Sequence, residues 1–179
     1  MTIRDILGSD LRLLIVAINP SLRSAERGHS FSSPGNPFWR LLHESELTPR
    51  RLAPHEEHLL PAYGIGLAST VRRATGGASD LTLEERRRGA DDVRTLVREH
   101  RPQTVALLGL TLYPLFFPTG TARGPGLKND RLEDTPLYVL PNPSGRNRAY
   151  AGFDAKLVWY RDLAHQLQAG AREPVVARS

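Results

Sequence analysis

The chain has 179 residues and no cysteine, which excludes disulfides, thiolate catalysis and iron–sulfur clusters. Its 24 basic residues outnumber 19 acidic ones, and all but two of the basic residues are arginine. Arginine binds phosphate well, so the composition fits a polyanionic ligand, although a GC-rich genome would give the same bias. No apolar run reaches the roughly 20 residues of a membrane span, and the N-terminus does not resemble a signal peptide. We expect a soluble, cytoplasmic protein with one domain over residues 1–168 and a flexible tail over 169–179.

Short apolar runs predict the strands of the fold. Leu11–Ile18, Thr104–Leu108 and Leu137–Leu140 are continuous apolar stretches of the kind buried on both faces of a parallel sheet. Residues 62–70 contain two glycines and predict a loop that leads into or out of a short strand. The segment Thr119–Asp134 is rich in glycine, proline and charge, and it predicts a long loop.

Helices are expected between these strands. The capping box Thr82-Leu83-Glu84-Glu85 predicts a helix that reaches about His100. Other helices are predicted from Pro37 to about Glu46, after Gly109 to about Phe117, and from a cap at Asp154 to about Gln168. The alternation of strands and helices predicts a three-layer α/β/α sandwich around a short, mostly parallel sheet.

Two predicted strands end in Asn-Pro pairs, namely Asn19-Pro20 after the first strand and Asn142-Pro143 after the last. Either pair alone is most simply a turn, because asparagine accepts turn conformations and proline ends strand pairing. If the strands are parallel, both loops project from the same edge of the sheet. Parallel sheets bind ligands at that edge, outside the carboxyl ends of their strands, so we place the candidate site there.

The two pairs belong to longer motifs. These are AINPSLRSAERGHSFSSPGNPFWRLL at Ala17–Leu42 and LPNPSGRNR at Leu140–Arg148. Both resemble motifs of the mismatch-specific uracil-DNA glycosylases and their thymine-DNA glycosylase relatives, and the resemblance extends over about residues 11–168. It implies a uracil-DNA glycosylase-like fold and a monomeric, cofactor-free enzyme. Such an enzyme flips uracil, or another mismatched or damaged pyrimidine, out of double-stranded DNA and hydrolyses its N-glycosidic bond.

The resemblance implies roles for residues of the first motif. Asn19 matches the family's catalytic asparagine, whose amide oxygen would orient a water toward C1′ of the flipped nucleotide. An asparagine cannot take a proton at neutral pH, so it positions the water without activating it. Phe31 matches the aromatic residue on which the extruded base stacks, although it could also be an ordinary core residue. Ile18 and Ser24 match positions that line the base pocket.

The second motif implies contacts with the duplex. Asn142 would support the same water, and Pro143 and Ser144 would compress the DNA backbone. The residues expected to enter the duplex and fill the vacated space are Gly145, Arg146 and Asn147. Bacterial members usually carry an apolar wedge where this chain has Arg146, which leaves the preference for the opposite base open. Arg146 and Arg148 are assigned to DNA binding, but both could instead be solvated loop residues.

Two further residues are expected near the site. Ser69 stands where some relatives carry a longer basic side chain, so it would leave a roomier pocket, or it could be a strand-end hydroxyl bonded to backbone. Asp80 precedes the capping-box helix. Its carboxylate could activate the water that Asn19 cannot activate, or it could simply interact favourably with the helix dipole.

The sequence also allows other functions to be considered. An iron–sulfur uracil glycosylase of similar fold is excluded by the missing cysteines. A nucleotide-binding enzyme lacks support, because neither a P-loop nor a GxGxxG turn follows any strand. A non-catalytic module that flips and shields a base would share the basic charge and the wedge loop. The histidines show no metal-ligand spacing, so no metal is expected.

Overall fold

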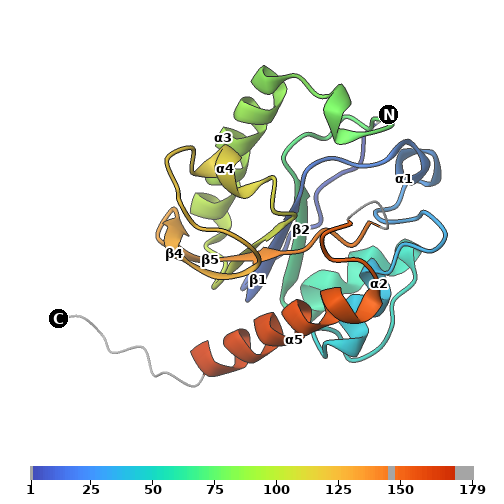
Figure 1. The fold of residues 1–179 in the computed structure, drawn as a ribbon. Coiled ribbons are helices and arrows are strands. Elements are labelled where there is room, and N and C mark those ends of the chain that lie inside the picture. Colours follow the sequence, from blue (N-terminus) through green and yellow to red (C-terminus); the bar gives the residue numbers. More distant parts are fainter. Residues whose placement is uncertain (1, 145–147, 172–179) are drawn as a thin grey trace.

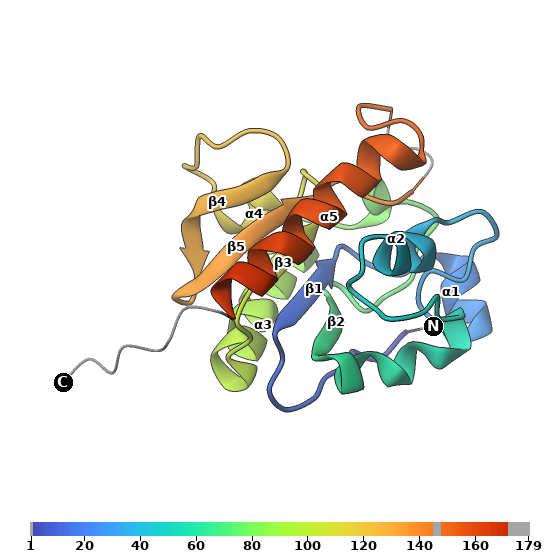
Figure 2. The same cartoon turned by 90° about the horizontal axis from the view of Figure 1, so that it is seen from below.

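The computed structural model describes residues 2–144 and 148–171 and contains a five-stranded sheet. The strands are β1 (Leu13–Ala17), β2 (Ile65–Ser69), β3 (Val105–Leu108), β4 (Gly126–Leu132) and β5 (Thr135–Leu140). They lie in the order β2-β1-β3-β5-β4 (Figure 2), and only β4 is antiparallel to its neighbour. The predicted mostly parallel sheet is therefore confirmed.

Helices cover both faces of this sheet. They are α1 (Leu22–Arg27), α2 (Phe38–Glu44), the 3-10 segments η1 (Pro54–Tyr63) and η2 (Ala78–Asp80), α3 (Leu83–His100), α4 (Tyr113–Phe116) and α5 (Phe153–Gly170). Helices α3 and α4 lie on one side of the sheet, and α2 and α5 lie on the other (Figure 1). The arrangement is the predicted three-layer sandwich.

Alternation along β1 builds a separate core on each face. Leu13 and Ile15 pack with α2 and α5, whereas Leu14 and Val16 pack with α3 and α4. All four side chains are fully buried. A continuous apolar strand is required here because successive side chains point to opposite faces, and both faces are covered.

The predicted capping box starts α3. The Thr82 hydroxyl accepts a hydrogen bond from the Glu85 amide at 3.1 Å, and the Glu85 carboxylate accepts one from the Thr82 amide at 2.8 Å. The predicted cap of α5 is wrong. Gly152 is the N-cap residue and Asp154 lies in the first turn, where its charge can still interact with the helix dipole. Helix α5 runs to Gly170, and residues 172–179 of the expected tail lie outside the described part of the chain.

The prediction of a loop over Thr119–Asp134 is wrong in its second half, where β4 forms a hairpin with β5. The turn residues Glu133 and Asp134 both have positive φ, 49° and 64°, as a two-residue type I′ turn requires. Such turns usually carry Asn-Gly, so the sequence gives no hairpin signal. Strand β4 lies at the edge of the sheet, and its polar residues, among them Lys128, suit an exposed edge.

The two Asn-Pro loops leave the sheet at the same edge, as predicted. Strands β1 and β5 are both parallel to β3, which lies between them. Neighbouring strands are about 4.8 Å apart, so the ends of β1 and β5 are separated by about 10 Å. Within residues 2–144 and 148–171, no helix is long and apolar enough to cross a membrane.

Candidate functional site

The amide group of Asn19 has a fixed orientation just beyond the end of β1. Its Nδ2 donates to the hydroxyl of Thr75 at 2.7 Å, and it also lies 3.1 Å from the carbonyl oxygen of Arg73 and 3.2 Å from that of Pro20. The single hydroxyl proton of Thr75 is donated to the carbonyl of Gly77 at 2.7 Å, so Thr75 must accept from Asn19. The nitrogen of the amide is therefore on the Thr75 side. No described residue donates to the opposite atom, Oδ1.

Asp80 is connected to Asn19 through this same set of contacts. Its Oδ2 accepts a hydrogen bond from the Gly77 amide at 3.0 Å and closes the 3-10 turn η2. Gly77 in turn accepts from Thr75, which accepts from Asn19. The side chain of Asp80 is exposed and forms no hydrogen bond with Asn19 itself. Asp80 therefore supports the loop that holds the Asn19 amide.

Ile18 anchors the adjoining segment by its backbone. Its carbonyl accepts hydrogen bonds from the Thr70 hydroxyl at 2.6 Å and from the Val71 amide at 2.9 Å. Helix α3 approaches this segment at Gly89, where an added Cβ would lie 2.0 Å from the Thr70 carbonyl oxygen. Only glycine permits so close an approach.

Ser24 and Phe31 lie in one hydrogen-bonded unit with the start of α1. Ser21 caps this helix by accepting from the Ser24 amide at 3.1 Å, and the buried Ser24 hydroxyl accepts from the Ser32 amide at 3.3 Å. Phe31 is partly buried and stacks on Phe38 with 3.9 Å between ring centroids. The first motif thus brings a polar amide and a partly exposed aromatic ring to the same end of the sheet.

A carboxylate that was not predicted also contacts this unit. Glu57, on η1, accepts from the Ser30 amide at 2.9 Å, and its other oxygen lies 3.1 Å from Nδ1 of His29. Burial of a carboxylate is costly unless it is paired and hydrogen-bonded, as Glu57 is here. Neither Glu57 nor Thr75 stands in a recognisable motif, so only the fold identifies them.

The second motif begins with an Asx turn. Asn142 accepts from the Ser144 amide at 2.9 Å, and Pro143 is buried. An added Cβ at Gly109, just after β3, would lie 3.6 Å from Nδ2 of Asn142. The predicted wedge residues Gly145, Arg146 and Asn147 lie outside the described residues. Arg148 is exposed, which is compatible with a contact to DNA.

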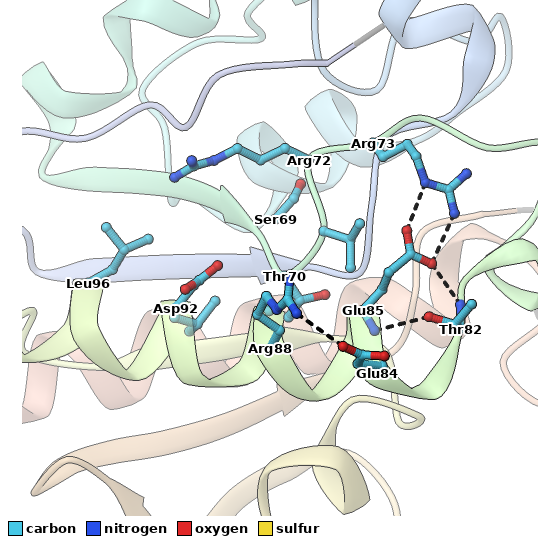
Figure 3. Close-up of a pocket in the computed structure, with 13 residues that line it drawn as sticks. Ser69, Thr70, Arg72, Arg73, Thr82, Glu84, Glu85, Arg88, Asp92 and Leu96 are labelled. Carbon is cyan, nitrogen blue, oxygen red and sulfur yellow. Dashed lines mark hydrogen bonds and ion pairs between the residues drawn. The ribbon is translucent and has the colours of Figure 1, made fainter.

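Ser69 is placed differently from the other predicted pocket residues. It lines a groove of about 620 Å³ between the end of β2 and α3 (Figure 3). Its backbone amide donates to Asp5 at 3.2 Å, and no hydrogen bond joins Ser69 to the side chain of Asn19. The arginines of this groove are paired with carboxylates, as in Arg73–Glu85 and Arg88–Glu84 (Figure 3). We therefore do not assign DNA phosphate binding to this groove.

The Arg73–Glu85 pair links the groove to the Asn19 loop. The two side chains form hydrogen bonds of 2.8 and 3.0 Å, while the carbonyl of Arg73 lies near the Asn19 amide. The bond from Arg73, together with the Thr82 amide, holds the pKa of the Glu85 carboxyl at about 2. Among the described residues, no group of three or more His, Cys, Asp or Glu side chains could hold a metal ion.

The protein is an α/β/α sandwich, and loops that carry an asparagine and an aromatic residue lie at the carboxyl ends of its parallel strands. Folds of this kind bind ligands at that edge of the sheet. The chain matches the uracil DNA glycosylase superfamily over residues 5–164. It therefore belongs to that superfamily, and its class is that of the DNA glycosylases. It is also similar to a Methanosarcina acetivorans protein whose solution NMR structure was determined as that of a candidate uracil DNA glycosylase. The two are 21% identical, the match covers 93% of this chain and 97% of that chain, and the TM-score is 0.63, which supports the fold.

Proposed function

We propose that this protein is a monofunctional, mismatch-specific uracil-DNA glycosylase. It flips uracil, and other mismatched or damaged pyrimidines, out of duplex DNA and hydrolyses the N-glycosidic bond, which leaves an abasic site. The observation that carries the proposal is the orientation of the Asn19 amide. Its nitrogen is held by Thr75 and two carbonyls, and its Oδ1 is left to accept a hydrogen bond from water.

The proposed reaction uses that water as the nucleophile. The water oxygen forms a bond to C1′ while the bond between C1′ and the base nitrogen breaks, and the electron pair leaves with the base. The water proton passes to the departing base or to solvent. Asn19 supplies orientation, because its amide cannot accept a proton at neutral pH. Catalysis then depends on stabilising the anionic base and the cationic sugar, so uracil, the better leaving group, is expected to react faster than thymine.

The first motif also provides a stacking surface for the flipped base. The partly exposed ring of Phe31 lies in the unit that Ser24 joins to the loop after β1. In the proposal Ile18 and Ser24 line the base pocket, Asn142 supports the water, and the loop from Pro143 to Arg148 contacts the duplex. Binding to DNA through arginines releases counterions, so affinity is expected to fall steeply with salt.

The test is a single-turnover assay on a duplex with one G·U pair, run in the presence of EDTA and followed by alkali to cleave abasic sites. The proposal expects strand cleavage after alkali only, with loss of orders of magnitude in rate for Asn19→Ala. A parallel A·U duplex tests mismatch preference. Binding of the G·U duplex without release of uracil would identify instead a non-catalytic module that shields the base.

A further inference from the structure

Glu57 is a buried carboxylate outside both motifs, on the 3-10 segment η1. It is 6% exposed, and its two oxygens contact consecutive residues of the loop before Phe31. One accepts from the Ser30 amide at 2.9 Å, and the other lies 3.1 Å from Nδ1 of His29. The next peptide unit, between Ser30 and Phe31, is held from another side, because Trp39 Nε1 donates to the Ser30 carbonyl at 3.3 Å.

These contacts flank a residue in an unfavourable backbone conformation. Phe31 has φ of 51°, in the left-handed region that bulky side chains rarely adopt. A strained conformation of this kind persists only where the surroundings determine it. On the other side of Phe31, Ser32 donates its hydroxyl to the His29 carbonyl at 2.6 Å. The ring of Phe31 is thereby directed onto Phe38, with an angle of 24° between the ring planes.

We propose that Glu57 is a positioning residue that holds Phe31 in its left-handed conformation, and so presents the aromatic ring on which the extruded base stacks. The stacking role rests on the function proposed above. The positioning role is a property of the folded protein and can be measured without DNA. Among the described residues, Glu57 is the one residue of η1 whose side chain forms hydrogen bonds with this loop.

The test compares Glu57→Ala, Glu57→Gln and the control Glu56→Ala. Glu56 is the adjacent carboxylate on η1, but it pairs with exposed Arg50 and does not contact the Phe31 loop. NMR signals of the Phe31 ring, assigned by their loss in Phe31→Leu, report the stacking on Phe38. We expect these signals to shift in Glu57→Ala, to return toward wild type in Glu57→Gln, which retains an acceptor for the Ser30 amide, and to stay in place in Glu56→Ala.

The single-turnover rate on G·U duplex connects this positioning to the reaction. Glu57→Ala should lower it by about tenfold or more, because a small misplacement of a group at the site is costly. Added to Phe31→Ala, it should cause no further loss, since the two act as one unit. Unchanged Phe31 signals in Glu57→Ala would overturn the proposal, and so would multiplicative rate losses in the double variant. If Glu57→Ala does not fold, Glu57→Met, which fills similar space and lacks an oxygen acceptor for the Ser30 amide, replaces it in both measurements. Shifted ring signals in a protein that releases no uracil would keep the positioning role and overturn the proposed activity.

Discussion

Nδ2 of Asn19 lies 2.7 Å from the hydroxyl oxygen of Thr75, across 56 residues of sequence. Thr75 is buried and donates its only hydroxyl proton to Gly77, so this contact has one possible direction. Rotation of the Asn19 amide by 180° would bring its oxygen against two carbonyl oxygens and a hydroxyl that has no proton left to donate. The loop after β2 thereby decides which amide atom of Asn19 can meet a water.

Thr75→Val should therefore lower the single-turnover rate by about tenfold or more, because it leaves the Asn19 amide without its shortest contact. Valine is nearly isosteric with threonine, so the loop should keep its packing. Thr75→Ser retains the hydroxyl and should stay within a few-fold of wild type. A rate loss in the serine variant with none in the valine variant would show that the methyl group, and not the hydrogen bond, is what the site needs.

A second prediction concerns the stability of the protein and the close approach of α3 at Gly89. Gly89→Ala would place a Cβ 2.0 Å from the Thr70 carbonyl and push α3 away from the segment that holds Ile18. Overpacking of this kind costs about 1–3 kcal/mol, and the Tm should fall by roughly 2–4 °C per kcal/mol. The matched control is Gly170→Ala at the end of α5, where an added Cβ meets nothing within 4 Å. Thermal denaturation of both variants checks the difference, and equal Tm values would contradict the predicted clash.

The lowered pKa of Glu85 predicts how the stability of the protein depends on pH. Arg73 and the Thr82 amide hold its pKa at about 2 in the folded protein, below the ordinary value of 4.5. A depressed folded pKa stabilises the protein above the unfolded value, and the benefit is lost as pH falls from about 4.5 toward 2. Glu85→Gln should therefore lower the Tm at pH 7 and converge on wild type near pH 2. The effect should shrink in high salt, since the pair is partly exposed.

Glu84→Gln is the control for this experiment. Glu84 lies on the same turn of α3 and pairs with Arg88, but both side chains are strongly exposed at 81% and 75%. An exposed pair contributes little to stability, so this variant should follow the wild-type Tm from pH 7 to acid. If Glu84→Gln and Glu85→Gln shift the Tm alike, the effect would belong to net charge and not to the Arg73 contact.

The sequence predicted the fold best where local patterns and tertiary packing agree. The capping box at Thr82 starts α3 as expected, and the apolar run of β1 is buried on both faces. Strand β4 was missed because it lies at an edge, where polar residues are favourable, and because its turn at Glu133 and Asp134 carries none of the usual turn residues. The Asp154 cap was misplaced by two residues, since Gly152 starts α5.

The candidate site was predictable only in the parts that form continuous motifs. Asn19 and Phe31 were identified because their neighbours match a family pattern. Their partners Thr75 and Glu57 contribute single side chains from distant segments, and their contacts arise only when β2 and η1 pack beside the first motif. A lone threonine or glutamate in a polar segment gives no sign of such a contact.

The sequence left two roles open for Asp80, an auxiliary base or a structural residue. Its contacts favour the structural role. Its Oδ2 accepts from the Gly77 amide at 3.0 Å, and Gly77 and Thr75 separate it from Asn19. Asp80→Ala removes both the acceptor and any base. Asp80→Asn keeps an acceptor for the Gly77 amide and removes only the base. The pair of variants therefore separates the two interpretations.

We predict that Asp80→Asn keeps the wild-type Tm, and that its single-turnover rate stays within a few-fold of wild type at every pH from 5 to 9. Asp80→Ala should lower both the Tm and the rate, because η2 loosens and the Thr75 contact with Asn19 weakens. General-base assistance is typically worth about 10²–10⁴-fold, so a base role would be plain in the asparagine variant. A large rate loss in Asp80→Asn, with a normal Tm and a flattened acid limb of the pH profile, would assign proton transfer to Asp80. With the predicted result, Asn19, the pocket and the DNA itself carry the hydrolysis.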